Sequence, residues 1–309
     1  MLSRTADHLY WMSRYMERAE NITRFVEVAN RLSLSVPSTR DRAACWQPVL
    51  TIAGGEDDFA ARHGERSAVS VIEYAVLDPT NPSSIYSSLR AARENAHAVR
   101  SVIPVETWES LNGTWLEARG LDGPRLREQG LIAFCEWVRE RSHQFRGITY
   151  GTMLRDEADY FIRLGTFLER ADNTARLLGV RATGVVPGQT VIDADDQLHW
   201  AAVLRSVSAF RAFRTVHGGD ITPLRAVDLL VMRAALPRSL HSCLNQVRDI
   251  LERLSPSAEC TRLAGAAHAQ IHYGRIDHLL AHGLGPFIDD FIDTNNALAD
   301  QIHKDFLLS

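Results

Sequence analysis

Residues 6–28 read ADHLYWMSRYMERAENITRFVEV, and residues 158–180 read ADYFIRLGTFLERADNTARLLGV. The two stretches align without a gap at an offset of 152 residues (158 − 6), and both contain the tripeptide Glu-Arg-Ala, at Glu17 and at Glu169. Any two amphipathic helices share apolar positions. Chance does not also restore an Asn and a second Arg in step, so the match predicts an internal duplication of the chain.

A second pair of segments matches further along the chain, at an offset of 155 residues (237 − 82). The identical residues are Pro82, Ser84, Ser87, Leu89 and Arg93, which correspond to Pro237, Ser239, Ser242, Leu244 and Arg248. The duplication therefore covers several helices rather than one. We expect a single domain over residues 1–309 that contains two internal repeats, approximately residues 1–115 and 153–283.

The remaining sequence favours helices. Apolar residues recur at helical spacing between breaks that contain Gly or Pro, and no segment shows the alternation of a strand ladder. The expected fold class is all-α, a helical bundle built from two similar multi-helix halves. In detail we expect one helix from Ala258 to about Gly283, a surface loop or short frayed helix over residues 54–66, and a non-helical connection from Arg181 to Gln197.

The composition is that of an ordinary globular protein, with 45% hydrophobic and 23% charged residues. The net charge of −4 and the lack of a basic block argue against nucleic-acid binding. Asp7, Arg14 and Glu17 interrupt any apolar run near the N-terminus, so we expect no signal peptide, no membrane span and a cytoplasmic location. The scattered cysteines are expected to be buried rather than metal ligands: Cys45, Cys135, Cys243 and Cys260.

Each copy of the repeated helix carries a narrow polar stripe, on a helical wheel that is apolar over more than half of its circumference. The stripe residues are Tyr10, Arg14, Glu17, Asn21 and Arg24 in the first copy, and Glu169, Asn173 and Arg176 in the second. A helix of this type is usually buried, where an unpaired carboxylate is costly. Two interpretations of the stripe follow, and the sequence does not choose between them.

In the first interpretation, the stripes form buried Glu–Arg networks that fix how the two halves dock. In the second, they line a polar cavity on a pseudo-two-fold axis. The residues of that cavity are Glu17, Glu169, Arg24 and Arg176. Paired carboxylates and guanidiniums are suited to a zwitterionic or phosphorylated ligand, so the second interpretation predicts a ligand-binding site.

Two carboxylate–histidine pairs have the i, i+3 spacing found in di-iron helix bundles, Glu94 with His97 and Glu140 with His143. The glutamates of the two repeated helices would then supply the remaining ligands. However, Glu94 aligns with Asp249 in the other repeat, whereas a duplicated metal fold should place its pairs in matching positions. This mismatch argues against a di-metal site.

Two further histidine pairs lie one helical turn apart, His268 with His272 and His278 with His282. This spacing can hold a metal ion. No Glu occupies the place that a zinc-protease motif requires, so we interpret these residues as part of a partly exposed helix. The sequence predicts no resident metal and no cofactor.

No catalytic motif stands out in the chain. It has no Walker phosphate loop, no GxGxxG fingerprint after a strand, no GxSxG elbow and no Cys–His nucleophile signature. A helix-rich protein with few recognisable catalytic groups is more often a binding module than an enzyme. Whether the chain is an enzyme is left open by the sequence.

Several separated motifs resemble the bacterial alpha-E proteins, which are helical and carry a recurring Glu-Arg motif. The motifs are LSRTADHLYWMSRYMERAEN (2–21), NPSSIYSSLRAARENAHAVR (81–100), RLGTFLERADNTARLL (163–178) and LLAHGLGPFI (279–288). Their order and spread cover nearly the whole chain. Within this resemblance, Glu17-Arg18 and Glu169-Arg170 match the Glu-Arg motif, and Arg93 and Glu94 join the candidate ligand-binding residues.

The resemblance also implies partners. Alpha-E proteins are encoded or fused beside circularly permuted ATP-grasp proteins and transglutaminase-like proteins, which implies a pathway that makes or breaks amide bonds on peptides. Our leading hypothesis is an accessory or binding protein that acts with an ATP-grasp amide ligase. The alternative is a stand-alone enzyme, with amide or peptide chemistry or a di-metal carboxylate site, that uses Glu17 or Glu169. A homo-oligomer is left open.

Overall fold

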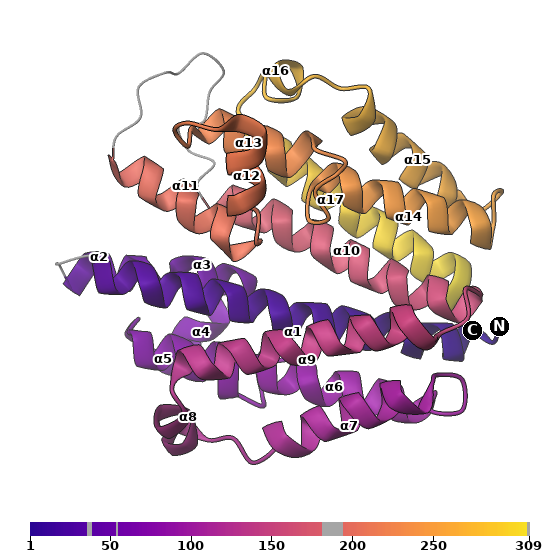
Figure 1. Cartoon of the computed structure of the whole chain (residues 1–309), viewed down its shortest axis with the longest axis horizontal. Helices are drawn as coiled ribbons and strands as arrows, with labels where there is room; N and C mark the ends of the chain where they lie inside the picture. Colours follow the sequence, from indigo (N-terminus) through magenta and orange to yellow (C-terminus); the bar gives the residue numbers. More distant parts are fainter. Residues whose placement is uncertain (36–38, 54, 181–193, 308–309) are drawn as a thin grey trace. The chain divides into compact units, whose positions relative to one another are not determined.

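The computed structural model describes residues 1–35, 39–53, 55–180 and 194–307 (Figure 1). Within these ranges the secondary structure is helical and no strand occurs, so the predicted all-α fold class is confirmed. The chain divides into two compact units, Met1–Thr166 and Phe167–Leu308, and we describe each unit by itself. The boundary between the units falls inside the second copy of the repeated helix, so the units and the predicted repeats are different divisions of the chain, and the repeats stay a prediction.

Unit 1 is built around the long first helix, α1. Its helices are α1 (Ser3–Ser35), α2 (Thr39–Ala44), α3 (Gln47–Ile52), α4 (Glu56–His63), α5 (Ala68–Ile72) with the π turn η1 (Glu73–Leu77), α6 (Ile85–Ala98), α7 (Val105–Ala118), α8 (Gly123–Gln129), α9 (Leu131–Thr152) and the first part of α10 (Glu157–Gly179). The apolar face of α1 is buried, and α1 packs against α6 and α9. Helix α7 packs against both α6 and α9.

Helix α4 forms in the stretch expected to be a surface loop or a short frayed helix. Its first turn contains Glu56, Asp57 and Asp58, and its last turn contains Arg62 and His63. Acidic residues near the N-terminus and basic residues near the C-terminus complement the helix dipole, which stabilises even a short helix.

Gly165 marks a close approach of α10 to α1 inside unit 1. A Cβ atom at this position would collide with the carbonyl oxygen of Tyr10 and with Oγ of Ser13. Ser13 is the residue that the repeat alignment pairs with Gly165, so the two helices touch at equivalent positions. Only glycine leaves room for this contact.

Unit 2 contains the rest of α10 and the C-terminal helices. These are α11 (Ala194–Ser206), α12 (Phe210–His217), α13 (Pro223–Met232), α14 (Leu240–Leu254), α15 (Glu259–His272), α16 (Ile276–Leu279) and α17 (Leu284–Ile302) with the π turn η2 (His303–Leu307). Helix α14 packs along α15, and both contact α13 (Figure 1). Helix α15 also contacts α17.

Two helix boundaries of unit 2 differ from those expected from the sequence. The single helix expected from Ala258 to about Gly283 is wrong, because α15 ends at His272 and the chain passes through Gly274 before α16 begins. At Gly274 a Cβ atom would collide with the carbonyl oxygen of Gln270, so the chain turns there on a glycine. Most of the connection expected from Arg181 to Gln197 lies outside the described residues, and α11 already begins at Ala194.

Two consecutive helices of unit 1 match two consecutive helices of unit 2 in their positions along the chain. The first residues of α6 and α14 are 155 positions apart, and α7 and α15 match at both ends with an offset of 154. The caps repeat too: Ser84 Oγ accepts from the Ser87 amide and donates to the Asp78 carbonyl. Ser239 makes the equivalent bonds, from Ser242 and to the Arg233 carbonyl. These correspondences agree with the internal duplication, which stays a prediction.

Candidate functional site

The polar stripe of α1 meets polar residues of α9 inside unit 1. At the centre lies Glu20, whose side chain is fully buried. Its Oε1 accepts from Nε and Nη2 of Arg24, at 3.0 and 2.7 Å, and its Oε2 accepts from the hydroxyl of Ser142 at 2.7 Å. Both carboxylate oxygens of Glu20 are therefore hydrogen-bonded to neighbouring side chains.

Arg146 of α9 joins Glu17 to this group. Its Nη1 lies 2.9 Å from Oε2 of Glu17, 2.5 Å from Oε2 of Glu20 and 2.8 Å from the hydroxyl of Ser142. On the solvent side, Nε2 of His143 lies 3.7 Å from Oε1 of Glu20. We call Glu17, Glu20, Arg24, Ser142 and Arg146 the α1–α9 ion cluster.

The α1–α9 ion cluster is balanced in charge, because two carboxylates face two guanidiniums. Glu17 is 1% exposed and Arg24 is 6% exposed, so these charges are shielded from bulk water. Burial of a charge is tolerated when it is paired and hydrogen-bonded. One turn further along, Glu27 forms ion pairs with Arg31 and with Arg139. The seam between α1 and α9 is thus ionic over several turns.

The helical period of α9 brings its polar residues onto one face. On α9, Arg139, Ser142 and Arg146 lie at i, i+3 and i+7, which places them on one helix face. Glu20, Ser142 and Arg146 were not among the site residues predicted from the sequence. One available signal was the match of Glu20 with Asp172 in the repeat, and the other was the spacing of polar residues along α9.

The other candidate residues of unit 1 do not belong to the α1–α9 ion cluster as defined above. The guanidinium of Arg14 donates to the Tyr10 hydroxyl at 3.1 Å and packs over the Trp11 ring. Arg93 contacts α7, where its Nε donates to Asn112 and its guanidinium covers the Trp108 ring. The two remaining candidates of unit 1 differ in exposure, because Asn21 is buried on α1 and Glu94 is exposed on α6.

The candidates on α10 belong to unit 2. Glu169 and Asn173 are buried there, and Nε of Arg176 donates to Oδ2 of Asp172 at 2.8 Å. This last pair occupies the positions equivalent to Arg24 and Glu20. A polar cavity that joins Glu17 to Glu169 stays a prediction, because these residues belong to different units.

The arginines of both Glu-Arg motifs have the same local contact. The guanidinium of Arg18 lies over the Tyr15 ring at 5.4 Å, and that of Arg170 lies over the Phe167 ring at 5.4 Å. Each contact is a cation–π interaction between positions i and i−3. Adjacent residues on a helix point about 100° apart, so in the first motif the Glu side chain faces α9 while the Arg packs on an aromatic ring of its own helix.

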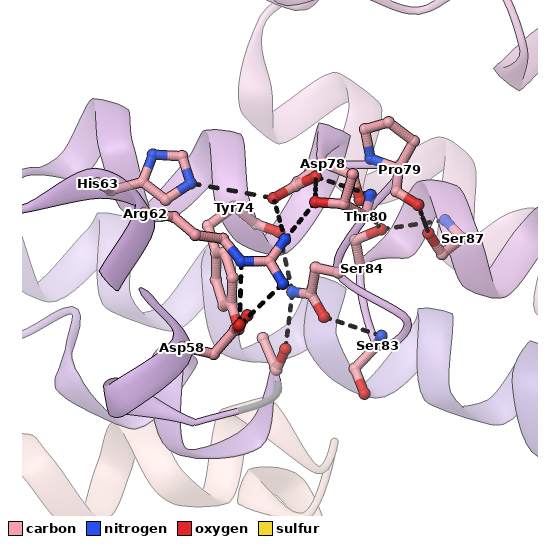
Figure 2. Close-up of polar contacts among 12 residues, drawn as sticks. Asp58, Arg62, His63, Tyr74, Asp78, Pro79, Thr80, Ser83, Ser84 and Ser87 are labelled. Atoms are coloured by element: carbon pink, nitrogen blue, oxygen red, sulfur yellow. Dashed lines mark hydrogen bonds and ion pairs between the residues drawn. The ribbon is translucent and has the colours of Figure 1, made fainter. Parts of the chain in front are cut away.

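A second polar network of unit 1 supports the turn before α6 (Figure 2). Arg62 of α4 donates to the Asp58 carboxylate and to the Thr80 hydroxyl, and it forms an ion pair with Asp78 at 3.7 Å. The hydroxyl of Tyr74 donates to Asp58 at 2.8 Å. These contacts tie α4, η1 and the turn at residues 78–81 together.

The network also affects ionisation. Burial opposes the charge on Asp78, but the hydrogen bonds from Thr80 and the Arg62 guanidinium outweigh it, and the pKa of Asp78 is lowered. Burial and then the Asp58 carboxylate raise the pKa of Tyr74. Both groups are therefore held in the forms expected of a structural network, an ionised Asp and a neutral Tyr.

The cysteines are free, and three of them are buried, as predicted: Cys135, Cys243 and Cys260. Burial raises the pKa of Cys135 and of Cys260 to about 12, so neither thiol is a thiolate near neutral pH. Among the residues that the structure describes, the close group of three potential metal ligands is His241, His268 and His272. The Glu94/His97 and Glu140/His143 pairs are not part of it.

Comparison with known proteins gives the family. A family model matches residues 1–307, and it describes Alpha-E, a predicted alpha-helical domain with a conserved ER motif. Uncharacterised proteins of Mycobacterium tuberculosis (strains H37Rv and CDC 1551) and of Mycobacterium bovis are each 24% identical over an alignment of 279 residues, and the alignment covers 84% of this chain.

The matched region covers 30% of each mycobacterial relative, so this chain spans less than a third of the length of those proteins. No solved structure matches the chain. None of the described helices has the length and apolar character needed to cross a membrane. Because the family model covers almost the whole chain and its Glu-Arg motif is present on both α1 and α10, the chain belongs to the Alpha-E family.

Proposed function

We propose that this protein is a cytoplasmic accessory or binding protein that acts with an ATP-grasp amide ligase in peptide or amide-bond synthesis or modification. A transglutaminase-like protein is a further candidate partner. The observation that carries the proposal is the state of the Glu-Arg helix in unit 1, where the acidic side chains are already engaged by arginines of the same unit.

A carboxylate that acts as a general base has to take a proton from the substrate. Glu17 and Glu20 instead share the guanidinium of Arg146, and a substrate would first have to break these ion pairs. A balanced, buried ion cluster of this kind is suited to holding two helices in one arrangement. The stand-alone enzyme that uses Glu17 is therefore less well supported than the binding protein.

The mycobacterial relatives add a second line of support. Their matched region is only 30% of the whole polypeptide, so in those proteins the Alpha-E region is joined to a large further part. A domain that lacks a recognisable nucleophile and occurs within a longer chain is suited to presenting a substrate or contacting a catalytic partner.

The proposal is tested with purified components. The tagged protein is first used to retain partners from its own cytosol, and the ATP-grasp protein encoded by the same genome is then purified and titrated against it by calorimetry. We expect a saturable complex and a faster release of phosphate from ATP in the presence of a glutamyl peptide acceptor.

One variant distinguishes the proposed binding protein from the stand-alone enzyme that uses Glu17. Glu17→Gln removes the charge of this carboxylate but keeps its size, so partner binding through other surfaces should persist. If the protein alone converts a glutamyl peptide, and Glu17→Gln abolishes that turnover without loss of stability, the protein is an enzyme and the proposal fails. It also fails if the ATP-grasp protein neither binds nor responds.

A further inference from the structure

Three histidines converge on one end of the helix pair α14–α15 in unit 2. His268 and His272 lie one turn apart on α15, and their rings stack with centroids 4.8 Å apart. His241, near the start of α14, places its Nε2 3.1 Å from Nδ1 of His272. One ring nitrogen from each histidine can be chosen so that all three lie within 4.8 Å of one another.

Hydrogen bonds orient two of these rings. Nδ1 of His241 lies 2.8 Å from the backbone carbonyl oxygen of Met232, to which it donates, and this leaves the lone pair on Nε2. Nε2 of His268 lies 2.6 Å from Oδ1 of Asn245 and donates in the same way, which leaves the lone pair on Nδ1. A carbonyl or amide oxygen behind an imidazole is the usual support of a metal-ligating histidine.

The histidines differ in exposure. His241 and His268 are buried, at 8% and 4%, whereas His272 is exposed. Burial, and then the nearby charge of Arg248, lower the pKa of His268 to about 4, so its ring is neutral at pH 7. Neutral imidazole is the form that binds a metal. The exposed ring of His272 leaves a path for an ion to enter.

The equivalent helix pair of unit 1 shows which residues packing requires at these places. At the offsets of the two helix pairs, Tyr86, Thr114 and Ala118 stand where unit 2 has its three histidines. Tyr86 packs edge-on against Trp115, and Thr114 and Ala118 are buried. At these three positions the unit 1 helix pair therefore packs without an imidazole, so the three histidines are not a requirement of this packing.

We propose that His241, His268 and His272 bind one divalent transition-metal ion of the zinc class, with a coordination position left open towards solvent. Around a tetrahedral ion with bonds of about 2.0–2.1 Å, the nitrogen ligands lie about 3.3 Å apart. The distance of 3.1 Å between Nε2 of His241 and Nδ1 of His272 is close to this value, and all three ligand atoms lie within 4.8 Å of one another, so the rings must close by a small movement around the ion. Three histidines with one open position are the ligand set of a reactive rather than a purely structural zinc site. Imidazole ligands suit Zn²⁺, Ni²⁺ and Cu²⁺ rather than Mg²⁺ or Ca²⁺.

Arg248 is the group that competes with the ion. Its Nη1 lies 3.1 Å from both ring nitrogens of His268, while its Nη2 is paired with the carboxylate of Asp249 at 2.6 Å. The ion must displace this guanidinium from the His268 ring. Removal of the positive charge should therefore strengthen metal binding, which a purely structural role of the cluster does not predict.

The experiment measures metal binding by the full chain after removal of any histidine tag and of bound metal. Zn²⁺ is titrated by calorimetry, and Co²⁺ is used in parallel because its visible absorption reports a tetrahedral site. We expect one ion per chain. The variant with His241→Tyr, His268→Thr and His272→Ala carries the residues of the equivalent unit 1 positions, and it should lose at least about 100-fold in affinity, since even second-shell changes cost 10–100-fold.

Three comparisons keep the test decisive. His272→Ala alone changes an exposed residue and should lose affinity while circular dichroism and thermal unfolding stay unchanged. His278→Ala with His282→Ala removes two other exposed histidines and should bind as the wild type does. Arg248→Gln should bind several-fold more tightly.

The proposal is overturned if the wild type binds no Zn²⁺ at equimolar concentrations. It is also overturned if the variant with the unit 1 residues binds as tightly as the wild type. Both readouts are independent of any amide ligase, so failure of this proposal leaves the proposed function untouched.

Discussion

The helix pairs α6–α7 and α14–α15 are built alike but hold different side chains between them. Both begin on a serine cap with the same hydrogen bonds, Ser84 in one and Ser239 in the other. The first pair fills its interior with aromatic and small residues, whereas the second gathers three histidines. The first pair shows that packing of aromatic and small residues is enough to hold such a helix pair together. The three histidines of the second pair are therefore not needed for packing, which supports the proposed metal site.

A second comparison, between acidic residues at corresponding positions of α1 and α10, gives the largest expected effect on stability. Glu20→Ala removes the buried carboxylate that is paired with Arg24 and one of the two that are paired with Arg146, which keeps its contact with Glu17. The change should lower the free energy of unfolding by about 3 kcal/mol, the range of a broken buried ion pair. The equivalent change Asp172→Ala breaks a pair with the partly exposed Arg176 and should cost less than about 1 kcal/mol. Urea unfolding measures both.

Equal losses for these two variants would mean that the ion cluster of α1 and α9 has no special role in stability. Glu20→Gln is the matched control, because it keeps the size of the side chain and one accepting oxygen while it removes the charge. It should lose less than Glu20→Ala does.

The pH dependence of stability should also distinguish the helix pairs. His268 has a pKa of about 4 in the folded protein and 6.5 in the unfolded chain, so between these values the unfolded chain binds more protons. Stability is therefore expected to fall as the pH is lowered from 6.5 towards 4. The groups that face His268 are Arg248, His241, His272 and Asp249.

His268→Thr places at this site the residue that unit 1 has at Thr114, which does not titrate. We expect thermal unfolding in metal-free buffer to show a smaller decrease between pH 6.5 and 4 for this variant than for the wild type. An identical pH profile would assign the decrease to other groups.

The smallest effect should be the same in both units. Ser84→Ala and Ser239→Ala each remove a side chain that accepts from the helix and donates to a carbonyl six residues earlier. Loss of such a cap costs about 1 kcal/mol. Chemical unfolding that shows a much larger loss for one variant would indicate that the two caps are not equivalent.

The sequence predicts the helices better than the site. The helical spacing of apolar residues between breaks that contain Gly or Pro predicted the fold class, because this pattern depends on neighbours along the chain. The partners of Glu20 could not be predicted, since Ser142 and Arg146 are more than 120 residues away and join it only through packing of α9 on α1. His241 was missed in the same way, because it reaches His268 and His272 from another helix.

The close approach at Gly165 has a consequence for how α1 and α10 can be assembled. The neighbours of Gly165 are Leu164 and Thr166, which both carry a Cβ atom. If α10 slid along α1 by a single residue, one of these Cβ atoms would meet the carbonyl of Tyr10. The glycine therefore fixes the register of the first part of α10 on α1 inside unit 1: it admits one alignment and excludes those on either side of it.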